Sequence, residues 1–251
     1  MAIELHSLRD IAAMRRAGRA AAETLDLVGT RLRPGVTTAD IDAWVREDTA
    51  ARGGHPAQLG YNGFPASVCT SKNEVVCHGI PSPAVTLEPG DIVNVDVTTR
   101  LGGFHGDTSR TFFIGEPSPE ARHLVETTER CLQAGIAVVR DGARLGDVGA
   151  AIVELATAEG CSVVREFCGH GIGRRMHQPP QVSHVGEAGT GLRLRAGMAI
   201  TIEPMLNLGS ADVQILDDDW TVITRDGSLS AQAEHTLVVT KQGAEILTPR
   251  P

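Results

Sequence analysis

The stretch of sequence that decides the fold runs from Asp91 to Asp107 and reads DIVNVDVTTRLGGFHGD. Successive side chains of a strand point to opposite faces of a sheet, so the three valines share one face while Asn94 and Asp96 share the other. The valine face can pack against a core. We therefore expect the stretch to begin with a strand that has one apolar face and one polar face.

The glycine-containing turn after this strand brings a second acid back toward Asp96. We expect the hairpin to centre on Leu101 and Gly102, which would set Asp96 nearly opposite Asp107. Two carboxylates in a half-buried cleft repel each other, and one must keep its proton unless a cation lies between them. A hard divalent ion with oxygen ligands removes that conflict. The alternative is that one or both acids cap turns or point into water.

Helical and extended segments follow one another in the same order twice along the chain. The expected helices span residues 11–32, 38–51, 120–140 and 145–159, and Thr38 is the expected N-cap of the second. The expected strands lie at residues 67–77 and 91–99 and near Ser162, Ala199 and Thr236. This order predicts two halves of mixed helix and strand.

Positions 107 apart match between the two halves, which indicates an internal duplication. The matched pairs are Gly35 and Gly142, Ile41 and Val148, Val45 and Ile152, Gly53 and Gly160, Gly90 and Gly197, and Asp96 and Glu203. So long a period fits two similar halves, about residues 7–119 and 120–248, rather than a solenoid. We expect an α+β fold that forms a single domain over residues 1–251, with a cleft at the pseudo-twofold axis between the halves.

Three further residues in the second half could share a site with the two aspartates. Glu203 takes the place of Asp96 in the repeat, and Glu234 lies in a run otherwise too apolar for a surface strand, where a charge needs a partner. His170 has a glycine on each side, which lets its imidazole approach a metal closely, although a histidine in a glycine-rich turn can simply be exposed. Four acids and a neutral imidazole would balance two dications.

Composition excludes several classes of protein. A formal net charge of −8 and a pI near 5.6 argue against a nucleic-acid-binding role. Five cysteines without the dense spacing of a disulfide scaffold indicate a reducing compartment. The charged first twenty residues argue against a signal peptide, and no apolar run is long enough to span a membrane. We expect a cytoplasmic protein.

Five motifs together resemble those of type I methionine aminopeptidases, in the order and with the spacing typical of that family. The motifs are NEVVCHGIP at residues 73–81, the segment from Asp96 to GDT at 106–108, CGHGIG at 168–173, TIEPM at 201–205 and SAQAEHT at 230–236. The resemblance extends over residues 7–248 and is greatest to the compact bacterial form. It implies the pita-bread fold, in which two similar halves surround a curved antiparallel sheet with metals in the central cleft.

The resemblance also implies a ligand set for two divalent ions. By motif match, Asp96 chelates one ion, Asp107 and Glu234 bridge both, and His170 and Glu203 complete the other. The same hard ligand set accepts Co, Mn, Fe or Zn, so the sequence leaves the physiological metal open.

Catalytic roles follow from metal chemistry and from the resemblance. A water shared by two cations loses a proton near neutral pH and can attack a peptide carbonyl, and the substrate's free amine would bind a metal. By resemblance, Glu203 shuttles the proton, while His78 and His177 hydrogen-bond the substrate. Alternatively, His78 only closes a turn and His177 only satisfies a loop carbonyl. We interpret His105 as a surface group or a neighbour of the ligands rather than a ligand.

An apolar pocket of limited length would select methionine. The residues at or near the positions that line this pocket in the family are Tyr61, Phe64, Cys69, Met176 and Trp220. Met and aromatic side chains suit a thioether, although ordinary core packing would use the same residue types. The chain departs from the pattern at three positions: Gln58 stands where some relatives carry Cys, and Met176 and Phe64 where some carry Phe and Tyr. The tolerated second substrate residue therefore stays open.

The resulting hypothesis is metal-dependent removal of the initiator methionine from nascent proteins and peptides, with a preference for a small second residue. The expected partners are peptides with an N-terminal methionine and nascent chains, with transient association with the ribosome, and the expected state is a monomer. Two alternatives share the fold: an Xaa-Pro aminopeptidase or prolidase, and a binding protein that has lost catalysis. The second alternative predicts missing ligands, and all five are present.

Overall fold

The computed structural model describes residues 3–249, and it contains four long helices and a short 3-10 helix. The helices are α1 (Leu8–Arg31), α2 (Thr38–Ala51), η1 (Tyr61–Gly63), α3 (Pro119–Ala137) and α4 (Leu145–Ala158). The strands of the first half are β1 (His55–Pro56), β2 (Cys69–Lys72), β3 (Val75–Cys77), β4 (Ile92–Leu101) and β5 (Phe104–Phe113). Those of the second half are β6 (Ser162–Val163), β7 (Gly169–Gly171), β8 (Gln178–Val182), β9 (Ala199–Ile202), β10 (Met205–Asn207), β11 (Val213–Ile215), β12 (Val222–Thr224), β13 (Ser230–Gln232), β14 (His235–Val239) and β15 (Ala244–Ile246).

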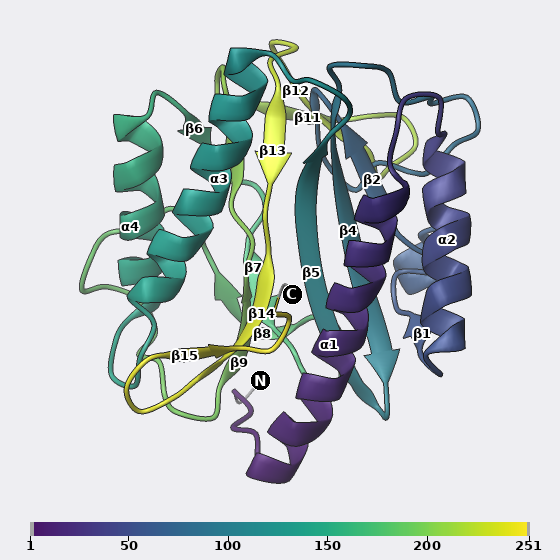
Figure 1. Ribbon diagram of the computed structural model, residues 1–251. Coiled ribbons are helices and arrows are strands. Elements are labelled where there is room, and N and C mark those ends of the chain that lie inside the picture. Colours follow the sequence, from purple (N-terminus) through teal and green to yellow (C-terminus); the bar gives the residue numbers. More distant parts are fainter. Residues whose placement is uncertain (1–2, 250–251) are drawn as a thin grey trace.

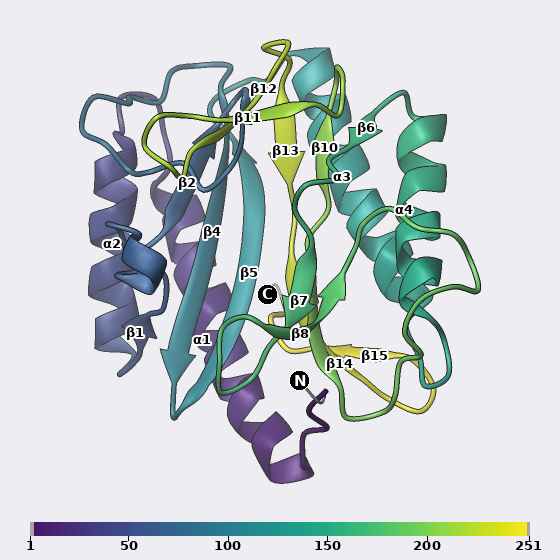
Figure 2. The same ribbon diagram turned by 180° about the vertical axis from the view of Figure 1, so that it is seen from behind.

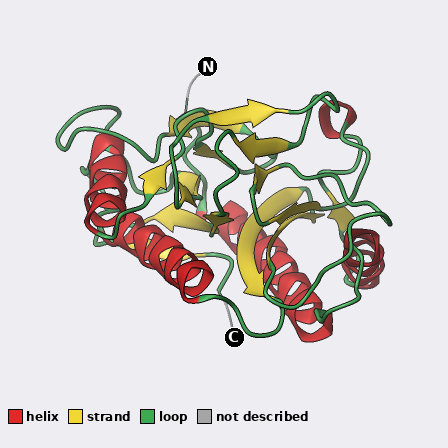
Figure 3. Cartoon of the chain, turned by 90° about the horizontal axis from the view of Figure 1, so that it is seen from above, coloured by secondary structure: helices red, strands yellow, loops and turns green. Residues whose placement is uncertain are grey.

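The helices cover one side of the strands. Figure 1 shows α1 and α3 in front of the strands, with α2 and α4 at the two flanks. From behind, the strands and their loops face the viewer without helices over them (Figure 2). The view from above places the helices along one side and the strands along the other (Figure 3). One face of the strand layer therefore packs on helices, and the other is available for a site. None of the described helices has the length and apolar character needed to cross a membrane.

The first helix of each half, α1 and α3, has a serine as its N-cap.

The predicted N-cap of α2 was wrong by one residue. Thr37, not Thr38, is the N-cap: its backbone is extended and its hydroxyl accepts a hydrogen bond from the Asp40 amide. The Asp40 carboxylate accepts in return from the Thr37 amide, which completes a capping box. The cap is therefore fixed by an acid three residues later rather than by the position of the first apolar residue.

The hairpin of β4 and β5 has a register that differs from the predicted one. Asp96 lies opposite Ser109 and Asp107 lies opposite Thr98, so the turn centres on Gly102-Gly103. Both turn residues have positive φ, +60° and +83°, as the tightest hairpin turns require. The prediction was one residue off because it put Leu101, a residue disfavoured at positive φ, into the turn. Asp96 and Asp107 still share a face, since the shift moves the partner by an even number of residues.

Matched positions of the two halves have the same local backbone. The φ angles are +88° and +89° at Gly35 and Gly142, +75° and +74° at Gly53 and Gly160, and +95° and +92° at Gly90 and Gly197. Two isolated β-bridges, Thr37 with Thr86 and Arg144 with Arg193, are also related by the same offset. The glycines are required at these places because other residues rarely adopt this left-handed conformation.

Each half packs its strands on its own pair of helices. The valine face of β4 is buried against α1 and α2 in one apolar cluster, whose other members include Leu25 and Ile41. Ile200 and Ile202 of β9 are buried in a second cluster with α3 and α4. Burial of a Val, Leu or Ile side chain contributes about 1.5–3 kcal/mol, so these two clusters fix β4 and β9, which carry the polar face between the halves.

Close contact of α1 with β5 depends on two glycines. A Cβ atom at Gly106 would overlap the backbone of Gly18, so neither the strand nor the helix has room for a larger residue there. Asp107 follows Gly106 directly. The packing of α1 against β5 therefore affects the position of the polar face of the hairpin.

Candidate metal centre

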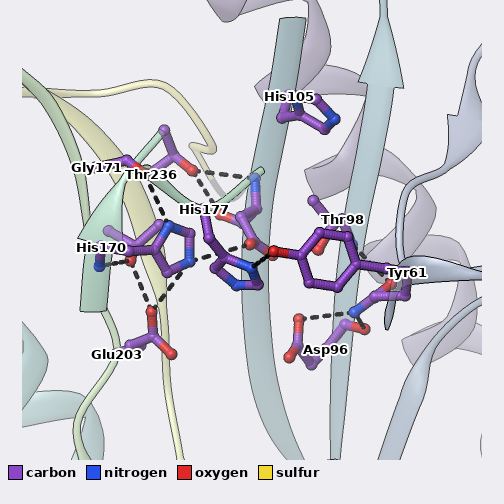
Figure 4. Close-up of polar contacts among 12 residues, drawn as sticks. Tyr61, Asp96, Thr98, His105, His170, Gly171, His177, Glu203 and Thr236 are labelled. Atoms are coloured by element: carbon purple, nitrogen blue, oxygen red, sulfur yellow. Dashed lines mark hydrogen bonds and ion pairs between the residues drawn. The ribbon is translucent and has the colours of Figure 1, made fainter. Parts of the chain in front are cut away.

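The five predicted ligands come from five separate places in the chain and meet at one cavity. Asp96 and Asp107 lie on β4 and β5, His170 on β7, Glu203 directly after β9, and Glu234 between β13 and β14. All five line a cavity of about 570 Å³. Figure 4 shows Asp96, His170 and Glu203 pointing toward a common space. The structure thus brings together residues that are up to 138 positions apart in sequence.

Distances between the side chains fit a shared cation. Ligand atoms of Asp107, His170 and Glu234 all lie within 4.8 Å of one another. The His170 Nε2 atom is 3.7 Å from Asp107 Oδ2 and 3.6 Å from Glu203 Oε1. Atoms this close, and too far apart for direct hydrogen bonds, leave room for an ion that each would contact.

The His170 ring is held with one nitrogen turned toward the acids. Its Nδ1 is hydrogen-bonded to the Gly171 carbonyl at 3.1 Å, so Nδ1 carries the proton and Nε2 offers a lone pair to the cavity. Burial, followed by the nearby His177, lowers the pKa of His170 to about 3. The imidazole is therefore neutral at physiological pH, which is the form that binds a metal.

Glycines beside His170 let β7 lie between its neighbours. A Cβ atom at Gly169 would be 2.5 Å from the Thr201 carbonyl oxygen, and one at Gly171 would overlap the Pro179 carbonyl. The sequence motif around His170 therefore serves close backbone approach, as its composition predicts.

The acids carry unusually high pKa values because they are buried. Burial raises the pKa of Asp107 to about 6 and that of Glu203 to about 8. Burial also raises the pKa of Asp96 and Glu234 well above the ordinary range, and the neighbouring carboxylates add to it. Among the described residues that line the cavity there is no lysine or arginine. Without a cation, Asp96, Glu203 and Glu234 would keep protons at neutral pH.

One atom in the cluster lacks any partner in the described part of the protein. Oε1 of Glu234 is buried and has no hydrogen bond. A buried carboxylate oxygen left unpaired is costly, and a metal ligand role would satisfy it. Divalent metal ions accept O and N ligands. They would therefore fit the unpaired Glu234 oxygen, the neutral His170 imidazole and the neighbouring acids.

Hydroxyl and amide groups orient the acids from behind. The Thr98 hydroxyl donates to Asp107 Oδ1 at 2.7 Å, and the Thr201 hydroxyl donates to Glu203 Oε1 at 2.6 Å. Thr236 exchanges hydrogen bonds with the Asp107 backbone (Figure 4). Each donor lies on a strand beside the acid that it holds. Alternate residues of a strand share a face, so Thr201 lies beside Glu203. This spacing of two residues is a sequence signal from which such donors can be found.

Sequence analysis did not identify His184 as a functional residue. Its Nε2 accepts a hydrogen bond from the Glu203 backbone amide at 3.0 Å, and burial lowers its pKa to about 3. No local pattern marks His184, because its role depends on a loop that comes back to the end of β9. Neutral His184 holds the backbone of Glu203 in place.

The two histidines predicted to contact substrate both line the cavity. His78, at a positive φ of +56°, packs edge-on against Phe167 and Trp220, and burial lowers its pKa to about 4. His177 lies at the exposed mouth, where its ring is 4.2 Å from that of His170 and its Nδ1 is 2.7 Å from the Tyr61 hydroxyl. Both imidazoles are therefore placed to contact a peptide bound beside the acids.

His105 does not line the cavity. It is buried, with 7% of its surface exposed, and its Nδ1 is hydrogen-bonded to the Gly173 carbonyl at 3.0 Å. His105 is therefore a buried residue of β5, two positions before Asp107, and not a surface group.

The five residues predicted to bind the methionine side chain also line the same cavity. They are Tyr61, Phe64, Cys69, Met176 and Trp220. The Phe64 and Trp220 rings pack edge to face with their centres 5.1 Å apart, and Phe64 and Cys69 belong to one buried apolar cluster. An apolar wall therefore lies beside the acids, within one continuous cavity.

Comparison with known proteins gives a family match over most of the chain. The family model of metallopeptidase family M24 matches residues 12–241. Methionine aminopeptidase A of a Synechocystis strain is 54% identical over 246 residues, which cover 98% of this chain and 97% of that protein. Methionine aminopeptidase of Escherichia coli K12 is 49% identical over 252 residues, which cover 100% and 95%.

Solved structures agree with these relatives. The crystal structure of methionine aminopeptidase from Rickettsia prowazekii has a TM-score of 0.97 and 47% sequence identity, and the match covers 99% of this chain and 100% of that one. The prolidase from Pyrococcus furiosus has a TM-score of 0.78 at 19% identity, and the match covers 98% of this chain and 66% of that one. The likeness to the prolidase extends to the fold alone.

Proposed function

Because the chain belongs to metallopeptidase family M24, we propose that it removes the N-terminal methionine from peptides and newly made polypeptides. Its fold is the pita-bread fold that the sequence predicts, with mixed helices and antiparallel strands. Relatives that are about half identical over nearly their whole length are named methionine aminopeptidases. The observation that carries the proposal is an apolar pocket next to four buried acids and a neutral imidazole in one cavity.

We assign the ligand positions for two divalent ions to the five predicted residues. Asp96 would hold one ion, Asp107 and Glu234 would bridge both, and His170 and Glu203 would complete the other. Bound there, the ions supply Lewis-acid polarisation of the scissile carbonyl and acidify a water molecule. The unpaired Glu234 oxygen and the raised pKa values of the acids support this assignment.

Three side chains would act on the substrate. Glu203 lies at the edge of the acid cluster with one oxygen bonded to Thr201, a position from which it would accept a proton and return it to the leaving amine. His78 and His177 would donate hydrogen bonds to the peptide from opposite parts of the cavity, one from its wall and one from its mouth. These contacts would hold the scissile bond in line with the acids.

The cavity suits a free amino terminus. Acids and neutral imidazoles line it, and the described lining residues include no cationic side chain. With the four acids balanced by two dications, the neutral free amine of a substrate would offer its lone pair to a metal, whereas an internal peptide segment has no amine to offer. This asymmetry supports an exopeptidase.

The apolar wall would receive the methionine side chain. Phe64 is 3% exposed and Met176 is 5% exposed, so both present packed surfaces rather than mobile ones. Aromatic edges are favourable partners for a thioether sulfur. Cys69 and Trp220 would complete the walls, and Tyr61 would lie at the mouth together with His177.

We also propose that the two halves act as one catalytic domain in the cytoplasm, as a monomer with transient access to the ribosome. The five free cysteines, four of them buried, support a reducing compartment. Ligands drawn from both halves require that the halves stay together.

A peptide assay tests the proposal. Met-Ala-Ser should be cleaved in the presence of Mn²⁺, and EDTA should abolish the cleavage. Acetylated Met-Ala-Ser, which lacks the free amine, should not be cleaved, and an Xaa-Pro peptide should be cleaved far more slowly. Preference for the Xaa-Pro peptide would replace the proposal by the prolidase-like alternative, and no cleavage of any peptide with saturating metal would overturn it.

A further inference from the structure

One edge of β4 has a gap that a side chain fills. Along this edge β2 pairs with residues 93–96 and β1 pairs with Thr99 and Arg100. The Ala57 amide continues the β1 pairing by donating to the Thr98 carbonyl at 2.8 Å, and there the pairing of the backbone stops. The segment of β4 between the two partner strands, Val97 and Thr98, directly follows Asp96, a proposed metal ligand.

The side-chain amide of Gln58 completes the missing pairing. Its Nε2 donates to the Asp96 carbonyl at 2.8 Å, and its Oε1 accepts from the Thr98 amide at 3.2 Å. An amide group that both donates and accepts along a strand edge copies what a backbone peptide would do. Gln58 is 6% exposed, so no water replaces these bonds easily.

The second N–H of the same amide points at the ligand itself. Gln58 Nε2 lies 3.3 Å from Asp96 Oδ1, while its first N–H is engaged by the Asp96 backbone (Figure 4 draws the contacts at Asp96 and Thr98). The Nε2 and Oε1 atoms of the Gln58 amide are both hydrogen-bonded to the β4 backbone, so the direction of this second N–H is fixed. Gln58 therefore contacts both the backbone and the carboxylate of Asp96.

We propose that Gln58 is a positioning residue for Asp96 and sets the affinity of one of the two metal positions, the one that Asp96 would complete. The inference rests on the proposed function, since it needs the two-metal site. A donor held rigidly beside a carboxylate oxygen fixes the orientation of the carboxylate, and a fixed ligand orientation aids metal binding. Asp107 and Glu234 would contribute to both metal positions. Gln58, by contrast, contacts only Asp96 among the five ligands.

The bonds that Gln58 makes require a side-chain amide. A thiol, by comparison, is one weak donor on a short side chain. A thiol cannot donate to Asp96 and accept from the Thr98 amide at once. The amide clamp on Asp96 is thus a property of this residue rather than of the fold.

Manganese titration of the full chain after removal of bound metal tests the proposal. Wild-type protein should take up two Mn²⁺ ions in calorimetry. Gln58→Met, which keeps the length of the side chain without its amide, should weaken one binding step by about tenfold and leave the other within about twofold. Asp96→Asn should weaken that same step, and adding Gln58→Met to Asp96→Asn should change it no further.

Two more variants protect the test from a folding defect. Gln58→Cys, which replaces the amide by a thiol, should show the same selective weakening, because Mn²⁺ prefers oxygen ligands to sulfur. Gln133→Met makes the identical exchange on the exposed face of α3 and should bind metal as the wild type does. Circular dichroism melting should show each variant folded.

The outcomes separate this inference from the function on which it rests. If wild-type protein takes up no Mn²⁺, the proposed two-metal site itself fails. If wild-type protein takes up two ions and the folded Gln58 variants bind both with unchanged affinity, only the role of Gln58 fails. Equal weakening of both steps would also overturn it, since that result would mean a general change of the cavity and not an effect on Asp96.

Discussion

The Tyr61 hydroxyl lies 2.7 Å from Nδ1 of His177, and their rings are 5.0 Å apart. Tyr61 belongs to η1 in the first half of the chain, and His177 directly precedes β8 in the second. Their hydrogen bond therefore closes the mouth of the cavity from both halves. It also fixes one nitrogen of His177, which leaves Nε2 for a substrate (Figure 4).

Replacing Tyr61 by Phe should lower kcat/KM for Met-Ala-Ser by about tenfold, because one hydrogen bond that orients His177 is lost, at about 1–1.5 kcal/mol. The ring and its packing would remain. Steady-state kinetics measure the effect. In a His177→Ala background the same exchange should cost nothing further, and an equal loss in both backgrounds would show that Tyr61 acts independently of His177.

Asp107→Asn should reduce turnover by at least about hundredfold, since it removes the charge that would bridge two cations. The fold should survive, because the Asp107 backbone keeps both of its hydrogen bonds to Thr236. Kinetics with saturating Mn²⁺, together with circular dichroism, measure the two effects. Asp48→Asn, on α2 outside the cavity, is the matched control. Wild-type turnover in the Asp107 variant would refute the bridging role.

Sequence alone was sufficient for features that depend on local patterns or on the repeat. Alternation along residues 91–97 predicts which face of β4 packs, and the offset of 107 residues leads from Asp96 to Glu203. The same reasoning placed the hairpin turn and the N-cap of α2 one residue away from their positions in the structure. The hairpin register depends on which two residues adopt positive φ, and the start of α2 depends on the acid that returns a bond to Thr37.

Contacts made by distant segments could not be predicted in this way. His184 touches the Glu203 amide because a loop comes back to the end of β9, and Gln58 touches Asp96 because β1 ends two residues before Gln58. Neither residue type nor spacing carries that information. Tertiary structure decides which polar side chain meets a backbone group that the sheet leaves unpaired.

Metal-free protein should lose stability as pH rises from 6.5 to 8. Burial raises the pKa of Glu203 to about 8 in the folded protein, above its ordinary 4.5. The native state therefore binds a proton that the unfolded chain lacks, and its stabilising effect, full below pH 4.5, disappears as pH passes 8. Histidines with lowered pKa, such as His78, are partly protonated only in the unfolded chain near pH 6.5, so they oppose the fall at the lower end of the range, whereas the raised pKa values of Asp96 and Glu234 add to it.

Urea unfolding in EDTA should show a fall of roughly 1–2 kcal/mol in unfolding free energy over this range, given about 1.4 kcal/mol per proton and pH unit. Saturating Mn²⁺ should flatten the dependence, because bound cations keep the acids ionised in the native state. Glu203→Gln, which removes one of the titrating groups, should make the dependence shallower in EDTA as well. A stability that rises from pH 6.5 to 8 in EDTA would contradict the raised pKa.

Phe64→Ala should change substrate selection more than it changes the chemical step. The Phe64 ring closes one wall of the apolar pocket against Trp220, so its loss enlarges the space for the first side chain of the substrate. We expect kcat/KM for Met-Ala-Ser to fall by about tenfold or more, through KM, and that for Phe-Ala-Ser to rise. Competition between the two peptides measures the ratio. Phe113→Ala, outside the cavity, should leave it unchanged.

Gly106→Ala should weaken both the fold and the metal centre. A Cβ atom there would overlap the Gly18 backbone, so α1 or β5 must move, at a cost of about 1–3 kcal/mol. Asp107 is the next residue, and its carboxylate would move with the strand. We therefore expect weaker Mn²⁺ uptake in calorimetry along with a lower melting temperature. Gly243→Ala is the matched control, since a Cβ atom at Gly243 would meet nothing within 4 Å. If the Gly106 variant melts and binds metal as the Gly243 variant does, close packing of α1 on β5 does not support the metal centre.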